Sequence, residues 1–243
     1  MTPAKQPWWK TATGYQIYPR SFCDSNGDGI GDIPGIISKL DYLADLGIGF
    51  IWLSPIYASP MRDNGYDISN YRYIAPEFGT LDDFDRLVRD ASKRGIRIVM
   101  DLVVNHCSSD HAWFRKACET RDCPEHDLFY WRDPKPETNG PPDDQRGCFG
   151  GSAWTWVETV GRYYYGHFGH QQPDLNWQNP RLRQDIYEMM NWWLDKGIGG
   201  FRMDVIDLIG KDLDARIYHE GPDMHRFVQE MHQACLAGRD VMT

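Results

Sequence analysis

The sequence predicts an α/β fold in which a parallel sheet is interrupted by one long insertion. Short apolar segments alternate with amphipathic segments of helical period once the chain is divided at its glycines and prolines. The segment 96–104 (IRIVMDLVV) ends in residues that are apolar on both faces, which is typical of a parallel strand covered on both sides. The pattern then breaks for residues 107–171, which are rich in Pro, Gly, Asp and aromatic residues. Because this stretch is too long for a bare connection, we expect an inserted subdomain there.

The part before the insertion is predicted to form a β-α-β-α-β series. The expected strands are 14–18, 50–53 and 96–104, and the expected helices are 33–46 and 81–94. The first helix has apolar residues at helical spacing, and the run FIWL that follows it indicates a buried strand. The second helix has Thr80 as its cap and acidic residues in its first turn, and Gly95 ends it.

Alternation resumes after the insertion. The expected elements are a helix at 182–196, a strand at 198–204, a helix at 222–236 and the opening of a further strand at 240–243. Four β/α units and the start of a fifth strand imply a larger parallel architecture. We therefore divide the chain into a first part of this architecture (1–106), an inserted domain (107–171) and a continuation of the first part (172–243).

Composition excludes several classes of partner. Lys and Arg total 26 against 35 Asp and Glu, a formal charge of −9, so we expect neither nucleic acid nor an anionic membrane as a partner. Aromatic residues make up 14% of the chain, which suits flat amphipathic ligands such as sugars. No apolar run is long enough to span a membrane or to serve as a signal sequence, so we predict a cytoplasmic protein. We expect its six cysteines to be free thiols, with a Cys118–Cys123 bridge as the alternative in an oxidising compartment.

Polar side chains follow two of the predicted strands where each strand ends. Asp101, Asn105 and His106 lie in DLVVNH, and Arg202 and Asp204 lie in GFRMD. In β/α barrels the C-terminal strand ends carry the active site. Arg202 and Asp204 are two residues apart, so they share one face of their strand, and an adjacent guanidinium keeps a carboxylate ionised. Such a pair alone could also be a buried ion pair, but the same feature on two strands favours an active site.

The sequence resembles the alpha-amylase family of glycoside hydrolases, near its oligo-1,6-glucosidase and dextran glucosidase group. The matching motifs are YQIYPRSF, WLSPIYASP, DNGYDISNY, DLVVNH, QPDLNW and GFRMDVIDLIGK, which together extend over nearly the whole chain. The resemblance implies the N-terminal portion of a (β/α)8 TIM barrel whose B domain is inserted after the third strand. It also implies a retaining α-glucosidase that acts on α-1,6 bonds of isomalto-oligosaccharides or dextran fragments from the non-reducing end.

The same resemblance implies roles for individual residues. Asp204 would be the nucleophile and Arg202 would keep it ionised. The residues expected to line the sugar site are Asp63 and His106 as hydrogen-bonding groups, Tyr66 as a stacking ring, and Phe168 and Gln172 as the wall. The residues expected to support them are Asp67, Asp101, Asn105 and Asp174. From the sequence alone, His106 and Phe168 also fit a structural histidine and a packing residue.

One element of the family's mechanism is not found in the sequence. Retention of configuration needs a second carboxyl about 5–5.5 Å from the nucleophile. In the family this is a Glu at the end of the fifth strand, whereas DVMT ends at Thr243. A later His-Asp pair that clamps the sugar is also not found. We therefore expect these 243 residues to be an incomplete and inactive fragment, with the whole enzyme a monomer.

The segment Asp24–Asp32 alternates oxygen-bearing side chains with glycines in the way of a calcium loop. Its start fits an EF-hand, but the twelfth position is Gly35 where a bidentate Glu is required, so a calcium sensor is not expected. The resemblance implies a bound Ca²⁺ here. The expected ligands are Asp24, Asn26, Asp28, the Ile30 carbonyl and Asp32. The alternative is a turn with solvated acids.

Three functions remain open. The first is the α-1,6-glucosidase. In the resembled group, a Val at the position of Val205, next to Asp204, accompanies cleavage of α-1,6 bonds, whereas a Thr there accompanies cleavage of α-1,4 bonds. A trehalose-6-phosphate hydrolase or a sucrose or trehalose isomerase would keep the fold and change the acceptor. A non-catalytic, transporter-associated relative would carry a membrane span and often lack the nucleophile, and we rank it last.

Overall fold

The computed structural model of the chain describes residues 6–243. Its central sheet has four parallel strands in the order β1-β2-β5-β9. The strands are β1 (Gly14–Ile17), β2 (Phe50–Leu53), β5 (Arg97–Val103) and β9 (Gly200–Asp204). Each of the four expected strands is present, and the parallel β/α organisation is confirmed.

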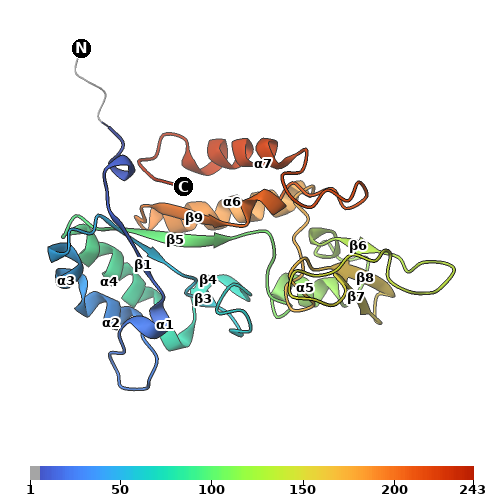
Figure 1. The fold of residues 1–243 in the computed structure, drawn as a ribbon, viewed down its shortest axis with the longest axis horizontal. Coiled ribbons are helices and arrows are strands. Elements are labelled where there is room, and N and C mark those ends of the chain that lie inside the picture. The colour runs from blue at the N-terminus through green and yellow to red at the C-terminus, as the bar shows by residue number, and fades with distance from the viewer. Residues whose placement is uncertain (1–5) are drawn as a thin grey trace, which may run out of the picture.

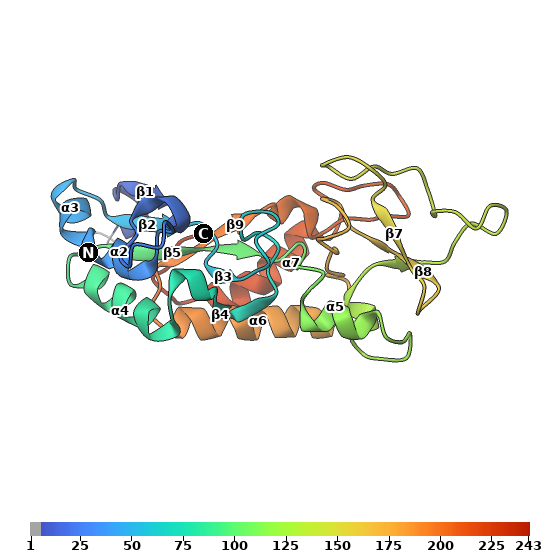
Figure 2. The same cartoon turned by 90° about the horizontal axis from the view of Figure 1, so that it is seen from below.

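Helices cover the sheet, as Figures 1 and 2 show. The helices are α1 (Pro19–Phe22), α2 (Ile33–Ser38), α3 (Leu40–Asp45), α4 (Leu81–Ser92), α6 (Pro180–Asp195) and α7 (Met224–Met231), with short turns η1 (Trp8–Lys10), η2 (Pro76–Phe78) and η4 (Ile206–Leu208). Thr80 caps α4, as the sequence predicts, and the structure shows that Asp83 completes a reciprocal capping box. The fully buried Trp193 of α6 packs edge-on against Phe84 of α4, with ring centroids 5.0 Å apart, so neighbouring helices share one core.

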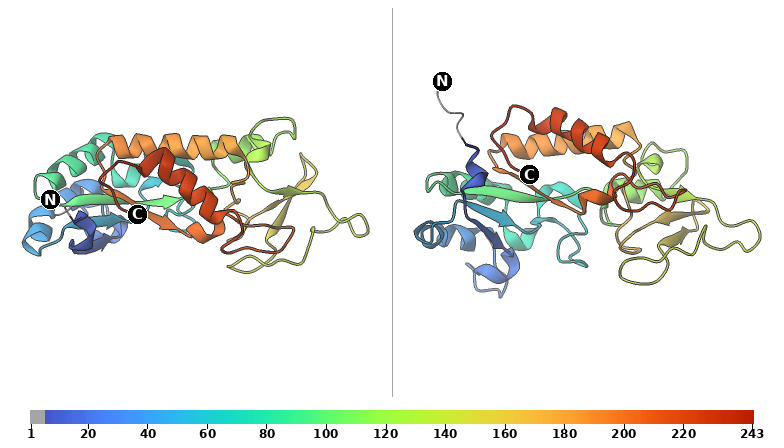
Figure 3. Two further views of the ribbon diagram at one scale, coloured as in Figure 1. Left: turned by 90° about the horizontal axis from the view of Figure 1, so that it is seen from above. Right: turned by 45° about the horizontal axis from the view of Figure 1, so that its top comes forward.

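The insertion forms its own antiparallel sheet beyond the C-terminal ends of β5 and β9 (Figure 1). Its elements are α5 (Ala112–Ala117), η3 (His126–Leu128), β6 (Trp131–Arg132), β7 (Trp154–Val157) and β8 (Arg162–Tyr165). A separate hairpin outside the insertion follows β2 and consists of β3 (Tyr57–Ala58) and β4 (Asn70–Ile74). Figure 3 shows the insertion at one end of an elongated molecule. The boundaries at 107 and 171 stay a prediction.

Three predicted elements differ from the observed ones. The helix expected over 33–46 is interrupted at Lys39, whose φ of −105° and ψ of 2° are not helical. Gly35 lets α2 approach the Cys23 carbonyl so closely that a Cβ would lie 1.9 Å from its oxygen, which ties α2 but not α3 to the preceding loop. The helix expected over 222–236 begins at Met224 and ends as a π-helical turn, η5 (His232–Leu236). Residues 240–243 form one parallel bridge, between Met242 and Gly200, rather than a strand.

The six cysteines are free thiols, as expected, and Cys118 and Cys123 do not form a bridge. Burial raises the pKa of the Cys118 thiol to about 11. Over residues 6–243, no helix is long and apolar enough to cross a membrane.

Candidate functional site

The register of β5 and β9 brings the polar groups of the two strand ends together. Asp101 pairs with Arg202 and Val103 with Asp204 in this parallel ladder. One guanidinium nitrogen of Arg202, Nη1, lies 2.6 Å from Asp204 Oδ1 and 3.1 Å from Asp101 Oδ1. Arg202 therefore holds two carboxylates, one from each strand, at the C-terminal edge of the sheet.

Asp101 is the buried centre of this group. Its carboxylate accepts hydrogen bonds from Trp52 Nε1 (3.0 Å) and the Tyr66 hydroxyl (3.2 Å) in addition to Arg202. Burial raises the pKa of Asp101 to about 6, and the positive charge of Arg202 opposes that shift. Compared with an unfolded chain, this group contributes stability below about pH 4 that is lost as pH rises through about 6.

A second group lies beside the first and consists of residues predicted to line the sugar site. Gln172 Nε2 donates to Asp63 Oδ2 at 2.8 Å and lies 3.2 Å from His106 Nε2. The Phe168 ring packs edge-on against His106, with centroids 4.9 Å apart. Burial lowers the pKa of His106, and the carboxylates of Asp174, Asp204 and Asp63 oppose this shift, so the imidazole is neutral at pH 7.

Asp63 is carried by a loop wound around the buried Asp67. The Asp67 carboxylate accepts hydrogen bonds from the Ser59 hydroxyl (2.9 Å) and the Asp63 amide (3.1 Å). The backbone is left-handed at Met61, Asn64 and Gly65, with φ values of 59°, 52° and 95°. A buried carboxylate that satisfies several backbone amides thus fixes the loop that presents Asp63.

Asp204 is followed by a strained residue. Val205 has φ 39° and ψ 42°, in the left-handed region. A β-branched side chain is unfavourable there, at a cost of about 1–3 kcal/mol. The strand turns into η4 at this residue, which leaves the Asp204 side chain at the strand end, 12% exposed.

The structure adds a residue that the sequence reasoning missed, Lys211. Its side chain is fully buried, and Nζ lies 2.6 Å from Asn105 Oδ1 and 2.9 Å from Asp174 Oδ2. Burial lowers the pKa of Lys211, and the contact with Asp174 opposes that shift. Its only sequence signal is its place as the last residue of the motif GFRMDVIDLIGK.

Two aromatic residues were also missed. The Phe149 side chain is exposed, and its ring lies 5.7 Å from that of Phe168. The Trp52 ring lies below the Arg202 guanidinium at 5.0 Å. Exposed Phe149, next to a ring that packs on His106, extends the apolar wall of the site away from Asp204.

The loop predicted to bind calcium is a series of tight turns. Asp24 accepts the amides of Gly27 (2.7 Å) and Gly29 (2.8 Å), and these bonds lower the pKa of its carboxyl. The Asp32 carboxylate caps α2 by accepting the Gly35 amide at 2.6 Å. In the described part of the chain, no three or more His, Cys, Asp or Glu side chains converge as a metal site.

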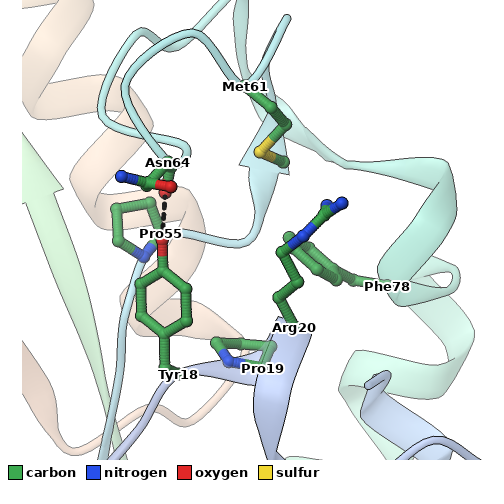
Figure 4. Close-up of a pocket in the computed structure, with 7 residues that line it drawn as sticks. All are labelled: Tyr18, Pro19, Arg20, Pro55, Met61, Asn64 and Phe78. Carbon is green, nitrogen blue, oxygen red and sulfur yellow. Dashed lines mark hydrogen bonds between the residues drawn. The ribbon is translucent and has the colours of Figure 1, made fainter. Parts of the chain in front are cut away.

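A cavity of about 210 Å³ is lined in part by Met61 and Asn64 of the loop that carries Asp63 (Figure 4). It is lined by Tyr18, Pro19, Arg20, Pro55, Met61, Asn64 and Phe78. The Tyr18 hydroxyl donates to the Asn64 carbonyl at 3.3 Å. None of the predicted site residues lines this cavity, although it is adjacent to Asp63 through Asn64.

The arrangement therefore combines two carboxylates held by one guanidinium, a neutral imidazole, an amide and a third carboxylate, with aromatic rings around them. Such a set can bind several hydroxyl groups and present the Asp204 carboxylate to an electrophilic carbon.

Comparison with known proteins gives the family of this chain. Residues 16–243 match the family "Alpha amylase, catalytic domain". The glucan 1,6-alpha-glucosidase of Streptococcus pneumoniae is 57% identical over 239 residues, and the palatinase of Erwinia rhapontici is 56% identical over 237 residues. Each alignment covers 98% of this chain and 43% of the relative, so the chain spans less than half the length of these relatives.

The solved structure of trehalose-6-phosphate hydrolase from Bacillus licheniformis superimposes with a TM-score of 0.95 at 48% identity, covering 98% of this chain and 44% of that one. This match confirms the expected fold class, the N-terminal portion of a TIM barrel. The chain belongs to the alpha-amylase family.

Proposed function

We propose that the whole protein containing this chain is a retaining α-glucosidase that hydrolyses α-1,6 bonds of isomalto-oligosaccharides or dextran fragments from the non-reducing end. The observation that carries this proposal is the Asp204 carboxylate, held at 2.6 Å by Arg202 beside a group of hydroxyl-binding side chains. The similarity to the Streptococcus pneumoniae glucan 1,6-alpha-glucosidase supports the substrate class.

In this proposal Asp204 attacks the anomeric carbon, and the bond to the leaving oxygen breaks as the glycosyl ester forms. A carboxylic acid must protonate that oxygen and then activate the water that hydrolyses the ester. We assign no residue of this chain to that role and propose the Glu that the family carries after its fifth strand.

The sugar would be held by the second group of residues. Asp63 and His106 would bind hydroxyls, and Gln172 orients the Asp63 carboxylate by donating to it at 2.8 Å. Tyr66 presents a ring whose hydroxyl is anchored on Asp101, and Phe168 closes the wall. Polar groups at one edge and aromatic faces at another match the amphipathic surface of a glucosyl ring.

Linkage preference is tested with two disaccharides. We expect a higher kcat/KM on isomaltose than on maltose, and we expect Val205→Thr to narrow the difference. A side chain next to the nucleophile changes discrimination by only about 1–3 kcal/mol, so the shift should be partial. The assay is glucose release by the whole protein and by a hybrid in which this chain replaces its counterpart in the Streptococcus pneumoniae relative. A preference for maltose in the parent would contradict the α-1,6 assignment.

A trehalose-6-phosphate hydrolase is the second candidate, because the Bacillus licheniformis enzyme has the same architecture over this chain. A sucrose or trehalose isomerase is the third. Trehalose 6-phosphate and sucrose are therefore assayed beside isomaltose: cleavage of the phosphorylated sugar indicates the hydrolase, and isomerised disaccharide indicates the isomerase. We further propose that the whole protein is a cytoplasmic monomer and that its partner is the oligosaccharide substrate.

We also propose a structural Ca²⁺ in the loop Asp24–Asp32. The side chains of Asp24, Asn26 and Asp28 are each oriented by hydrogen bonds from the loop backbone, and Asp24 Oδ2, Asn26 Oδ1 and Asp28 Oδ1 each accept one such bond and keep a second lone pair. Because an ion that binds the folded state stabilises it, EDTA should lower the Tm and excess Ca²⁺ should restore it. The measurement is scanning calorimetry of the whole protein with EDTA, with and without added Ca²⁺. Identical curves would mean that the loop is only a turn.

A further inference from the structure

The His106 ring faces an amide nitrogen at both of its own nitrogens. Nδ1 lies 3.2 Å from Asn105 Nδ2, and Nε2 lies 3.2 Å from Gln172 Nε2. An amide nitrogen only donates, whereas a neutral imidazole has one donor and one acceptor. Because burial keeps this ring neutral at pH 7, only one of the two contacts can be a hydrogen bond, and the tautomer decides which one.

The orientation of the Asn105 amide is settled by its other neighbours. An ammonium group has only donors, so the Asn105 atom 2.6 Å from Lys211 Nζ must be the oxygen. The opposite end of the amide agrees, because Nδ2 lies 3.3 Å from the Asp174 Oδ2 acceptor. Lys211 and Asp174 are both fully buried and bonded to each other, which leaves the amide one orientation.

We infer that Lys211 is a positioning residue that, through Asn105, holds His106 in the tautomer with its proton on Nε2. With Asn105 Nδ2 donating to Nδ1, that ring nitrogen is the acceptor. Nε2–H then becomes a donor at the edge of the ring that faces Asp63 and Gln172.

This donor lacks an acceptor in the described structure. Gln172 presents its amide nitrogen to His106, and the same nitrogen donates to Asp63 at 2.8 Å. A hydroxyl group of a ligand would satisfy this donor, because its oxygen can accept from His106 Nε2–H while its proton is donated to Asp63. That last step rests on the proposed function, whereas the tautomer does not.

The tautomer is measured directly, without substrate, by ¹⁵N NMR of the whole protein labelled on histidine, with the His106 signals assigned by their loss in His106→Gln. We expect the ¹⁵N shift of Nδ1 to be that of an unprotonated ring nitrogen and that of Nε2 to be that of a protonated one. A proton on Nδ1 would overturn the inference, whatever the enzyme cleaves.

Two variants test the chain of contacts. Asn105→Asp keeps the shape and the Lys211 pair but offers His106 an acceptor, so the proton should move to Nδ1. Lys211→Gln removes the 2.6 Å ammonium contact that fixes the Asn105 oxygen and leaves only the longer 3.3 Å contact of Asn105 Nδ2 with Asp174, so a share of the Nδ1–H tautomer should appear. Lys196→Gln is the matched control, because Lys196 pairs with the exposed Asp85 and should leave the spectrum unchanged.

Activity on isomaltose supplies the second readout. In Asn105→Asp, His106 should lose its hydrogen bond to a substrate hydroxyl. The loss of one such bond corresponds to a fall in kcat/KM of about 2- to 12-fold. If Asn105→Asp keeps the proton on Nε2, the inference is wrong. If Lys211→Gln keeps a single Nε2–H tautomer, Lys211 does not control the tautomer of His106. If Lys211→Gln fails to fold, the result for Asn105→Asp alone tests the inference.

Discussion

Asp204→Asn is expected to abolish turnover of isomaltose, by a factor on the order of 10⁴ to 10⁶ in kcat, because an amide cannot form the glycosyl ester. The fold should persist. Asn is the same shape, and its carbonyl oxygen can still accept from the Arg202 nitrogen that now lies 2.6 Å from Asp204 Oδ1. The measurement is steady-state kinetics on the whole protein, with circular dichroism to confirm folding.

The matched control for this variant is Asp195→Asn. Asp195 lies at the end of α6, where it pairs with Arg239 on the surface, so its loss should leave kcat within twofold. An Asp204→Asn enzyme within tenfold of wild type would remove Asp204 from the mechanism.

Lys211→Met is expected to lower the free energy of unfolding by about 3–5 kcal/mol, because it leaves Asp174 buried without its partner. The Tm should fall with it. The measurement is denaturant unfolding of the whole protein together with a thermal scan. The physical basis is the 2.9 Å contact between two side chains that are both fully buried.

Two comparisons isolate the buried charge as the cause. Adding Asp174→Asn to Lys211→Met should recover part of the loss, because the remaining partner is then neutral. Lys196→Met breaks the pair with Asp85, which is 48% exposed, and should cost about 1 kcal/mol or less. A Lys211→Met protein within 1 kcal/mol of wild type would contradict the prediction.

The fold was predictable from the sequence where local patterns control it. The strand boundaries at β1, β2 and β5 agree with the apolar runs to within one residue. The break at Lys39 was not predictable, because the apolar stripe continues through it from Ile36 to Leu40. It accompanies the approach of Gly35 to Cys23, a contact between separate elements that has no periodicity to reveal it.

The candidate site shows the same division. The pattern that places Arg202 and Asp204 on one face predicts their contact, since side chains two apart on a strand point the same way. The pattern does not predict that Asp101 pairs with Arg202, which depends on the register between β5 and β9. It also does not predict the left-handed backbone of Val205, because a β-branched residue is the least expected one there.

The sequence by itself determined the alternation of strands and helices, the place of the insertion and the polar residues at the strand ends, because each follows from spacing along a short stretch of chain. Only the tertiary structure decided which residues meet across separate elements. Lys211 is 106 residues from Asn105 in the chain, yet they are in contact at 2.6 Å. The physical reason is that a buried charge acquires its partners from sheet register and loop packing, which arise only when distant elements pack together.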